Sequence, residues 1–289
     1  MRELVAVLLG GVSLSAIYAL LAIGLSLIYG VSRILNYSYG SFFTWAAYCA
    51  WFLFSVFAWL NYPIAFIAVI GFMFLFGLVV ERGLIRPLRW KPDWQITTIL
   101  VTIALALTLD NIALYVFGGL RKSLPKLVGG TIEFGGFTMG RGDVVVLVAA
   151  VVAVIILGLF LKKTRIGMSM RAVAQDMVGA QIVGIPVNKV FSYTFAISAV
   201  LAGIAAILIS HKHFIYPTAG WHIFIKAFII VIFGGIGSMW GTLCAAFILG
   251  IAEAVVGWQV GLMWVMPFWF VILMAGLIVK PTGLFGAVE

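Results

Sequence analysis

The feature that most constrains this chain is a series of long apolar stretches without charge. Residues 4–31 carry no charged side chain, and neither do residues 37–80. A helix needs about 20 apolar residues to cross about 30 Å of hydrocarbon, so both stretches reach or exceed the length of a membrane span. Of the 289 residues, 64% are hydrophobic and 9% are charged. A water-soluble fold is therefore excluded, and the bilayer is the solvent for much of the surface.

Dividing the sequence by this length predicts an all-α polytopic membrane protein with eight to nine transmembrane or partly re-entrant helices. Residues 1–289 are expected to form a single transmembrane domain. The spans are expected over residues 4–31, two within 37–80 separated by a turn at Asn61-Tyr62-Pro63, and others over 95–118, 144–161, 190–210 and 263–279. Residues 223–233 are apolar but too short to cross, residues 234–238 break the pattern, and 241–256 resume it. How residues 223–256 are counted decides between eight and nine.

The polar links between the apolar stretches predict the topology. A link over 81–94 holds four basic residues, and the segment over 162–189 is expected to form one or two short surface helices with a turn at Gly184-Ile185-Pro186. If links alternate sides, these two segments share a side with Arg33 and Lys280, and together they hold more than half of the 18 basic residues. Basic residues concentrate in cytoplasmic links, so this side is predicted to be cytoplasmic. Residues 119–143, with the alternating Thr131-Ile132-Glu133-Phe134, are predicted to form a small hairpin or loop on the outer side.

The remaining residues give little support for catalysis, metal binding or nucleic-acid binding. The net charge of +9 lies in short links rather than on one polar face, and Cys49 and Cys244 both lie within apolar stretches. The pair His211-x-His213 lacks a nearby third ligand, and the sequence contains no phosphate-binding Gly-rich loop ending in Gly-Lys-Ser/Thr. We therefore predict no catalytic residue, no metal and no cofactor. Energy for pumping must come from another chain or from an ion gradient.

Polar residues within the apolar stretches are costly, so each is a candidate for function. Asp110 and Asn111 either line a pore or brace helices, or the carboxylate is satisfied near the interface by a basic loop residue or by backbone. Glu253 is expected to reach the headgroups from the end of its span, and Lys226 to extend toward the interface. The glycines of residues 234–238 either shape a gate for solute or allow a tight helix crossing.

Several short motifs, in the right order over nearly the whole chain, resemble the LivH-type permease subunits of branched-chain amino acid ABC importers. The motifs are Gly24-Leu25-Ser26-Leu27-Ile28-Tyr29-Gly30-Val31-Ser32-Arg33-Ile34-Leu35-Asn36-Tyr37, Glu81-Arg82, Arg86-Pro87-Leu88, Thr164-Arg165-Ile166-Gly167, Arg171-Ala172, Gly184-Ile185, Phe233-Gly234-Gly235-Ile236-Gly237-Ser238 and Lys280-Pro281-Thr282-Gly283-Leu284-Phe285-Gly286. One motif departs from the family: members commonly have Asn-Phe-Ala-His-Gly-Glu where this chain has Asn36-Tyr37-Ser38-Tyr39-Gly40-Ser41. The missing imidazole and carboxylate put branched-chain specificity in doubt.

The resemblance implies a multi-pass permease domain in the cell inner membrane. Its expected partners are a second homologous permease subunit, two cytoplasmic ABC ATPase subunits and a soluble solute-binding protein. By this likeness the segment that couples to the ATPase contains Arg171, Ala172, Gln175, Asp176, Gly184, Ile185 and Pro186. The residues expected along the translocation path or gate are Asn36, Tyr37, Asp110, Asn111, Gly234, Gly235, Gly237 and Ser238. The alternative is a self-contained channel or secondary transporter for a small polar solute such as urea.

Overall fold

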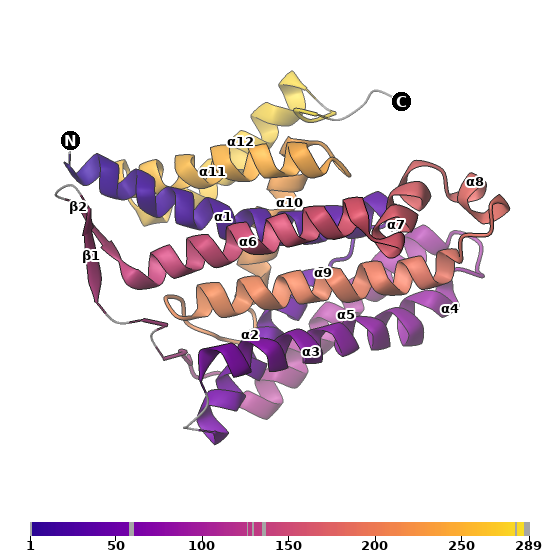
Figure 1. The fold of residues 1–289 in the computed structure, drawn as a ribbon, viewed down its shortest axis with the longest axis horizontal. Helices are drawn as coiled ribbons and strands as arrows, with labels where there is room; N and C mark the ends of the chain where they lie inside the picture. The colour runs from indigo at the N-terminus through magenta and orange to yellow at the C-terminus, as the bar shows by residue number, and fades with distance from the viewer. Residues whose placement is uncertain are drawn as a thin grey trace. The chain divides into compact units, whose positions relative to one another are not determined.

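The computed structural model describes residues 2–57, 61–125, 127–128, 130–134, 137–280 and 282–285. Figure 1 traces the chain by residue number. The chain divides into two compact units, each built from segments distant in sequence. Unit 1 comprises Met1–Ser26, Lys126–Val154 and Ile225–Glu289, and unit 2 comprises Leu27–Pro125 and Ile155–Phe224.

The described residues are mostly helical. The helices are α1 (Arg2–Ser32), α2 (Tyr39–Val56), α3 (Tyr62–Val80), the π-helix η1 (Glu81–Ile85), α4 (Arg86–Leu88), α5 (Trp94–Phe117), α6 (Arg141–Lys163), α7 (Arg165–Gln175), α8 (Met177–Ile182), α9 (Val187–Ser210), α10 (Ala219–Gly234), α11 (Met239–Gln259), the 3-10 turn η2 (Leu262–Trp264) and α12 (Val265–Val279). The strands β1 (Thr131–Phe134) and β2 (Phe137–Gly140) pair antiparallel, with Thr131 opposite Gly140. The hairpin that the sequence left open against a loop is therefore formed.

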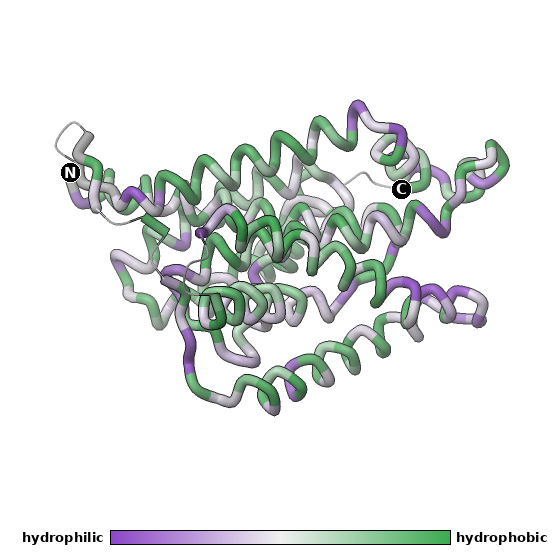
Figure 2. The backbone as a smooth tube through the Cα atoms, turned by 60° about the horizontal axis from the view of Figure 1, so that its bottom comes forward, coloured by the Kyte–Doolittle hydropathy of each residue, from purple (hydrophilic) through white to green (hydrophobic). Residues whose placement is uncertain are grey.

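Among the described residues, seven helices are long and apolar enough to cross a membrane. Figure 2 shows hydrophobic residues along the helices and hydrophilic ones mainly at their ends and in the connections. The all-α polytopic class is confirmed. The total of eight or nine spans stays a prediction, because it also depends on α2, with 18 residues, and α10, with 16.

The helix boundaries and breaks predicted from the sequence are largely confirmed. Helix α3 begins at Tyr62, so Pro63 lies in its first turn, where the missing N–H leaves no intrahelical bond unmade. Two short helices, α7 and α8, fill the polar segment after α6, and the glycine turn at Gly184 follows them. The backbone also breaks between α10 and α11 where the sequence predicted it.

Helix α9 is the core of unit 2. Over the 18-residue apolar stretch of α9, 83% of the residues are buried, and α2 and α3 pack against this helix. Small residues allow this contact: a Cβ atom on Gly77 of α3 would lie 2.8 Å from the Cα of Ala196, and one on Gly203 of α9 would lie 2.9 Å from Met73 Cγ. Figure 1 shows α9 running alongside α3.

In unit 1, α1 crosses α11 at similarly close range. Ser15 Oγ donates to Gly11 O at 2.7 Å within α1 and contacts Phe247 O of α11 at 3.3 Å. A Cβ atom on Gly250 would lie 2.4 Å from Ser15 Oγ. The backbones of the two helices therefore approach closely, as expected of helices that associate in lipid.

Candidate functional site

The break between α1 and α2 is closed by its own hydrogen bonds and by α5. Arg33 ends α1 with a φ of 56°. Asn36 is fully buried, and its Oδ1 accepts from the Ser38 amide at 3.1 Å and from Ser38 Oγ at 2.6 Å. The Tyr37 amide donates to Thr102 Oγ1 of α5 at 3.3 Å. The short coil is thus held in one conformation beside α5.

Asp110 braces three helices of unit 2. Its carboxylate accepts from Ser41 Oγ of α2 at 2.8 Å and from Trp221 Nε1 at the start of α10 at 2.7 Å. The residue is 6% exposed. This arrangement agrees with the helix-bracing interpretation, since the donors to the carboxylate are a hydroxyl and an indole rather than a basic loop residue.

Asn111 does not join Asp110. Its side chain is exposed, and its amide donates to Leu107 O of the same helix at 2.7 Å. Successive helical residues point about 100° apart, so the two polar neighbours lie on different faces. The sequence-predicted pair is therefore divided: Asp110 lies inward with the α1–α2 break and Asn111 faces outward.

Two glycines bring α2 and the first turn of α10 into backbone contact in unit 2. A Cβ atom on Gly220 would lie 1.9 Å from Gly40 O, and one on Gly40 would lie 2.7 Å from Gly220 O. The Gly220 amide donates to Thr44 Oγ1 at 3.0 Å. Sequence analysis missed Gly40, Gly220 and Trp221, because nothing local marks a crossing between segments so far apart in the chain.

Replacing Asp110 by alanine should lower the free energy of unfolding by about 1.5–3 kcal/mol, because two buried donors lose a charged acceptor. Thermal unfolding of the purified chain in mild detergent measures this loss. Asp110→Asn keeps the shape and one acceptor, so its effect should be smaller. Asn111→Ala is the matched control and should stay within about 0.5 kcal/mol of wild type. Equal losses for Asp110→Ala and Asn111→Ala would contradict the bracing role.

The break between α10 and α11 lies in unit 1 and depends on glycine. Gly235 and Gly237 have φ values of 99° and 84°, in the left-handed region that favours glycine. Ser238 caps α11 by accepting from the Gly241 amide at 3.1 Å. A Cβ atom on Gly234 would lie 2.6 Å from the Gly241 carbonyl. The tight crossing proposed as one interpretation is therefore present.

The segment after α12 covers the end of α10. The amides of Leu284 and Phe285 donate to the last α10 carbonyls, Phe233 O at 2.8 Å and Gly234 O at 3.2 Å. Gly283 has a φ of 77°. A Cβ atom at this position would lie 2.5 Å from Ile232 O, so the contact requires glycine. Two motifs that are far apart in sequence, residues 233–238 and the stretch that includes residues 282–285, thus meet. The exposed backbone of a half-length helix is satisfied by protein.

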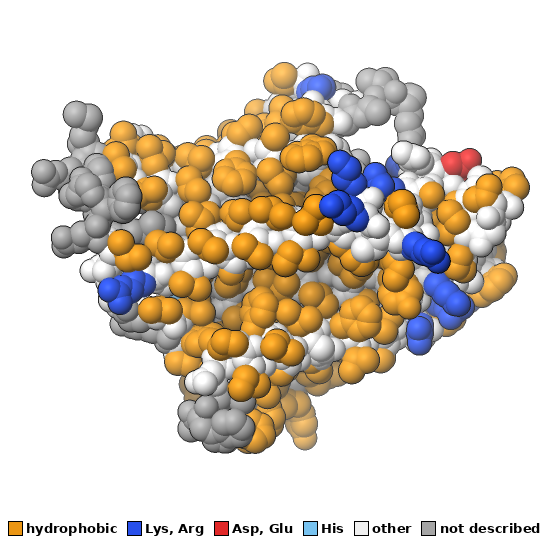
Figure 3. Space-filling view, in the orientation of Figure 1, with side chains coloured by type: hydrophobic (Ala, Val, Ile, Leu, Met, Phe, Trp, Pro, Cys, Tyr) orange, Lys and Arg blue, Asp and Glu red, His pale blue; other side chains and the backbone are white. Residues whose placement is uncertain are grey.

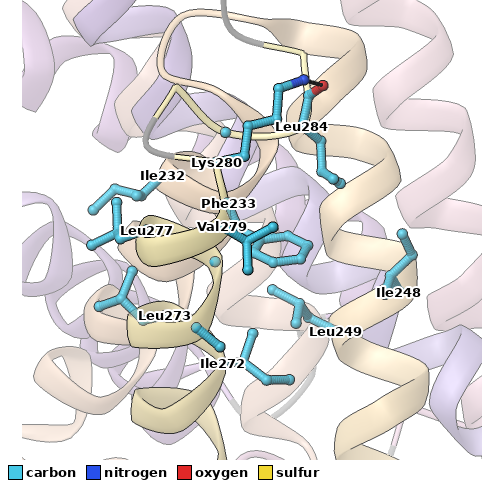
Figure 4. A pocket seen from close by; sticks show the side chains of 13 residues that line it. Ile232, Phe233, Ile248, Leu249, Ile272, Leu273, Leu277, Val279, Lys280 and Leu284 are labelled. Carbon is cyan, nitrogen blue, oxygen red and sulfur yellow. Dashed lines mark hydrogen bonds between the residues drawn. The ribbon is translucent and has the colours of Figure 1, made fainter.

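An apolar cavity of about 320 Å³ lies beside this contact. Figure 4 shows Ile232 and Phe233 of α10, Ile248 and Leu249 of α11 and Leu273 of α12 around it. At its rim, Lys280 Nζ donates to Leu284 O at 2.8 Å. Apart from Lys280, the lining side chains are apolar.

The short helices α7 and α8 carry the predicted coupling residues. Thr164 caps α7 by accepting from the Gly167 amide at 3.0 Å, and Asp176 caps α8 by accepting from the Val178 amide at 2.9 Å. Gly184, with a φ of 82°, ends α8. Of the predicted residues, Ala172 and Ile185 are half-buried, and Arg171, Gln175, Asp176, Gly184 and Pro186 are exposed.

Helix α8 also exposes an apolar patch that sequence analysis missed. Val178, Ile182 and Val183 are 62%, 80% and 74% exposed. We call these three residues the α8 patch. Val178 and Ile182 are four residues apart and share one face of α8, and Val183 follows at its C-cap. The four-residue spacing of Val178 and Ile182 is the signal that was available. An exposed apolar patch in an otherwise polar segment is typical of a protein-binding surface.

A buried charge cluster lies at the same end of unit 2. Glu81 was predicted to lie in a polar link, which is wrong: the helix continues through η1 and α4, and Glu81 is fully buried. Its carboxylate pairs with Arg89 and accepts from Ser192 Oγ of α9. Arg89 also donates to Asn188 Oδ1 at 3.1 Å, and its guanidinium lies 4.1 Å from the ring centre of Phe191. Burial lowers the pKa of Arg89, and the Glu81 carboxylate opposes that change.

Contacts also join the links predicted to share one side. Arg33 donates to Ala174 O of α7 at 3.3 Å, while Arg89 bonds Asn188 at the start of α9. Lys122, in the predicted outer loop, instead lies 3.5 Å from the Trp51 ring centre at the other end of α2. Within unit 2, the links at Arg33, 81–94 and 162–189 therefore lie together.

Glu253 was expected to reach headgroups and Lys226 to extend toward the interface, and the structure pairs the two with each other. In unit 1 the two side chains form an ion pair, with 2.6 Å between Lys226 Nζ and Glu253 Oε1. Nothing local in the sequence indicates that α10 and α11 bring them together. Within the described part of the chain, no three His, Cys, Asp or Glu side chains gather closely enough to hold a metal ion.

A sequence model described as "Branched-chain amino acid transport system / permease component" matches residues 7–280. The chain belongs to this permease family. It is 30% identical over 295 residues to the high-affinity branched-chain amino acid transport system permease protein BraD of Pseudomonas aeruginosa, covering 98% of this chain and 95% of BraD. It is 28% identical over 292 residues to LivH of Escherichia coli, covering 96% and 94%, and 26% identical over 261 residues to LivM of the same organism, covering 83% and 61%. No solved structure matches the chain.

The match and the seven span-length helices establish a LivH-type permease that crosses the membrane several times. The resemblance stated from the motifs is confirmed.

Proposed function

We propose that this permease is the transmembrane subunit of an ATP-driven importer for branched-chain or related amino acids in the cell inner membrane. Residues 1–289 act as one permease domain. A soluble binding protein delivers the solute to the outer side, and two cytoplasmic ATPase subunits drive its passage. ATP hydrolysis belongs to those partner chains, so this chain is not an enzyme.

The observation that carries this proposal is the α8 patch on a pair of short helices between two spans. Apolar side chains exposed outside the span-length helices favour burial against a partner, and a short helix placed in a groove is a common form of recognition. Figure 3 shows Lys and Arg side chains gathered over this end of unit 2, where α6 ends and α9 begins. Basic residues at that density favour the cytoplasmic side, where ATPase subunits would lie.

Similarity to two permeases of one organism supports a second homologous permease as partner. LivH and LivM of Escherichia coli are both named as permease proteins of the high-affinity branched-chain amino acid transport system, and this chain resembles both. A pair of related subunits would enclose the solute path between them.

The contacts of unit 2 indicate how movement of the ATPase subunits would be transmitted to the solute path. Arg33 in the α1–α2 break is bonded to Ala174 O of α7, and α9 follows α8 after a short turn at residues 183–186. A shift of α7 and α8 would therefore move both the break and the helix against which α2 and α3 pack. In this alternating-access scheme the path passes beside α5, where Asn36, Tyr37 and Asp110 brace the helices and Asn111 faces outward, and Gly234, Gly235, Gly237 and Ser238 form a gate.

The proposal is tested by purifying the chain from native membranes in mild detergent. Two ATPase subunits and a second permease should co-purify, and reconstituted complexes should hydrolyse ATP faster when loaded binding protein is added. Solute uptake by the chain alone in liposomes would instead support a channel or secondary transporter for a small polar solute such as urea.

A cysteine placed at Gln175 or Gln181 should react with a membrane-impermeant thiol reagent only after cells are permeabilised. Both glutamines are exposed, so access to them depends on the side of the membrane. The variants are made in a Cys49→Ala/Cys244→Ala background. Leu120→Cys, at the opposite end of unit 2 and 82% exposed, is the control and should react in intact cells. The reverse pattern would invert the topology and contradict the importer.

A further inference from the structure

An ion pair in unit 1 joins four helices. Lys226 Nζ of α10 lies 2.6 Å from Glu253 Oε1 of α11 and donates to Tyr18 Oη of α1 at 2.8 Å. Trp269 Nε1 of α12 donates to Glu253 Oε2 at 2.9 Å. Both carboxylate oxygens are therefore engaged, and the ammonium has two oxygen partners.

Aromatic rings hold this arrangement in place. The rings of Tyr18 and Trp269 meet edge to face with 5.8 Å between their centres, and Trp269 is fully buried. Lys226 Nζ lies 5.2 Å from the centre of the Tyr18 ring and 5.8 Å from that of Trp269. Cation–π attraction at such distances adds to the ion pair where water is scarce.

The ion pair is mostly buried among apolar helices of unit 1. Tyr18 lies about 24 Å from the start and about 21 Å from the end of the 31-residue α1, at about 1.5 Å per residue. The side chains of Lys226 and Glu253 are 15% and 12% exposed. Charges removed so far from water are costly, and an apolar pair of similar volume is often as stable or more so. Stability alone is therefore a weak reason to find charges here, whereas opposite charges can fix one arrangement of helices.

Helix α10, which carries Lys226, ends at the break at residues 234–238. Helix α10 has 16 residues, too few to cross the bilayer alone, so its position depends on contacts with its neighbours. Lys226 lies two helical turns before Gly234, about 12 Å along the axis. Because an α-helix is stiff over this length, the position of Lys226 sets that of the break.

We propose that Lys226 and Glu253 are positioning residues whose opposite charges fix α10, and with it the break at residues 234–238, for solute passage. The proposal rests on the proposed function of that break as a gate. It requires the charges themselves at this site, in either order across the two helices.

The test uses Lys226→Glu, Glu253→Lys, the double charge swap Lys226→Glu/Glu253→Lys and the neutral pair Lys226→Met/Glu253→Gln. Each is combined with Ile236→Cys in the Cys49→Ala/Cys244→Ala background, because Ile236 lies in the break and is 40% exposed. Two readings are taken: the rate at which a water-soluble thiol reagent labels Cys at position 236, and solute uptake by the reconstituted importer. Lys91→Glu is the control for charge reversal, because Lys91 is an exposed basic residue outside the ion pair.

Each single reversal should change the labelling rate at least about fivefold and reduce uptake at least about tenfold. The double swap should bring both to within about threefold of wild type. If the single reversals fail to fold, the neutral pair decides: it should reach wild-type amounts in the membrane, yet change labelling and reduce uptake severalfold. Wild-type labelling and uptake in the neutral pair, or a double swap that folds and remains as defective as the single reversals, would overturn the proposal.

Failure of the importer proposal gives a different result. A wild-type complex without ATP-dependent uptake would contradict that function, while labelling at position 236 would still show whether the charges position the break.

Discussion

Replacing Glu81 by alanine is expected to lower the free energy of unfolding by about 3–5 kcal/mol, since a buried guanidinium loses its carboxylate. Glu81 is fully buried, and the side chain of its partner Arg89 is 11% exposed. The Ser192 hydroxyl would lose the same acceptor. The measurement is thermal unfolding of the purified chain in mild detergent.

Arg82→Ala is the control for this prediction. Arg82 is exposed and belongs to the same π-helix, so its removal should change the unfolding free energy by no more than about 0.5 kcal/mol. Replacing both members of the pair, as Glu81→Met/Arg89→Met, should recover much of the loss because no charge remains buried. A Glu81→Ala variant as stable as Arg82→Ala would show that the pair does not hold η1 to α9.

Replacing Ile182 of the α8 patch by glutamate is expected to weaken ATPase association at least about 30-fold, the loss of about 2 kcal/mol that defines an interface hot spot. The new carboxylate would have to leave water when the patch is buried against the partner. Ile182 is 80% exposed, so the isolated chain should unfold at the wild-type temperature. Co-purification and a binding titration with the purified ATPase measure the effect.

Leu120→Glu is the matched control because Leu120 is 82% exposed at the opposite end of unit 2. It should leave ATPase association unchanged. Charge reversal at the exposed Arg171 of α7 should also reduce association while the helices remain folded. Unchanged assembly in both Ile182→Glu and Arg171→Glu would remove this segment from the docking role.

The sequence predicts the helices well because the bilayer imposes a length on each. Apolar runs, the interruption before Tyr62 and the break at residues 234–238 depend only on neighbouring residues, and the structure confirms them, although Tyr62 and Pro63 begin α3 rather than form a turn. The short helices after α6 follow from local signals too, with Thr164 and Asp176 as caps.

The sites depend on partners that no local pattern reveals. In the sequence Glu81 is only a polar residue at the end of an apolar run. Nothing near it shows that Ser192, far along the chain, lies beside it. The sequence does not show which of the neighbours Asp110 and Asn111 faces the other helices. In the structure only Asp110 accepts from Trp221. Lys226 and Glu253 each resemble an interfacial charge until α10 and α11 are placed together. Pairings between distant segments of this kind were therefore beyond sequence analysis.

The contact between residues 283–285 and the end of α10 has a consequence for biosynthesis. The carbonyls of Phe233 and Gly234 receive their donors from Leu284 and Phe285, about 50 residues later in the chain. At about 5–20 residues per second, the ribosome needs several seconds to supply them. During that interval a nascent chain has α10 in the bilayer with two carbonyls unsatisfied, and water or the insertion machinery must shelter it until α12 has been delivered.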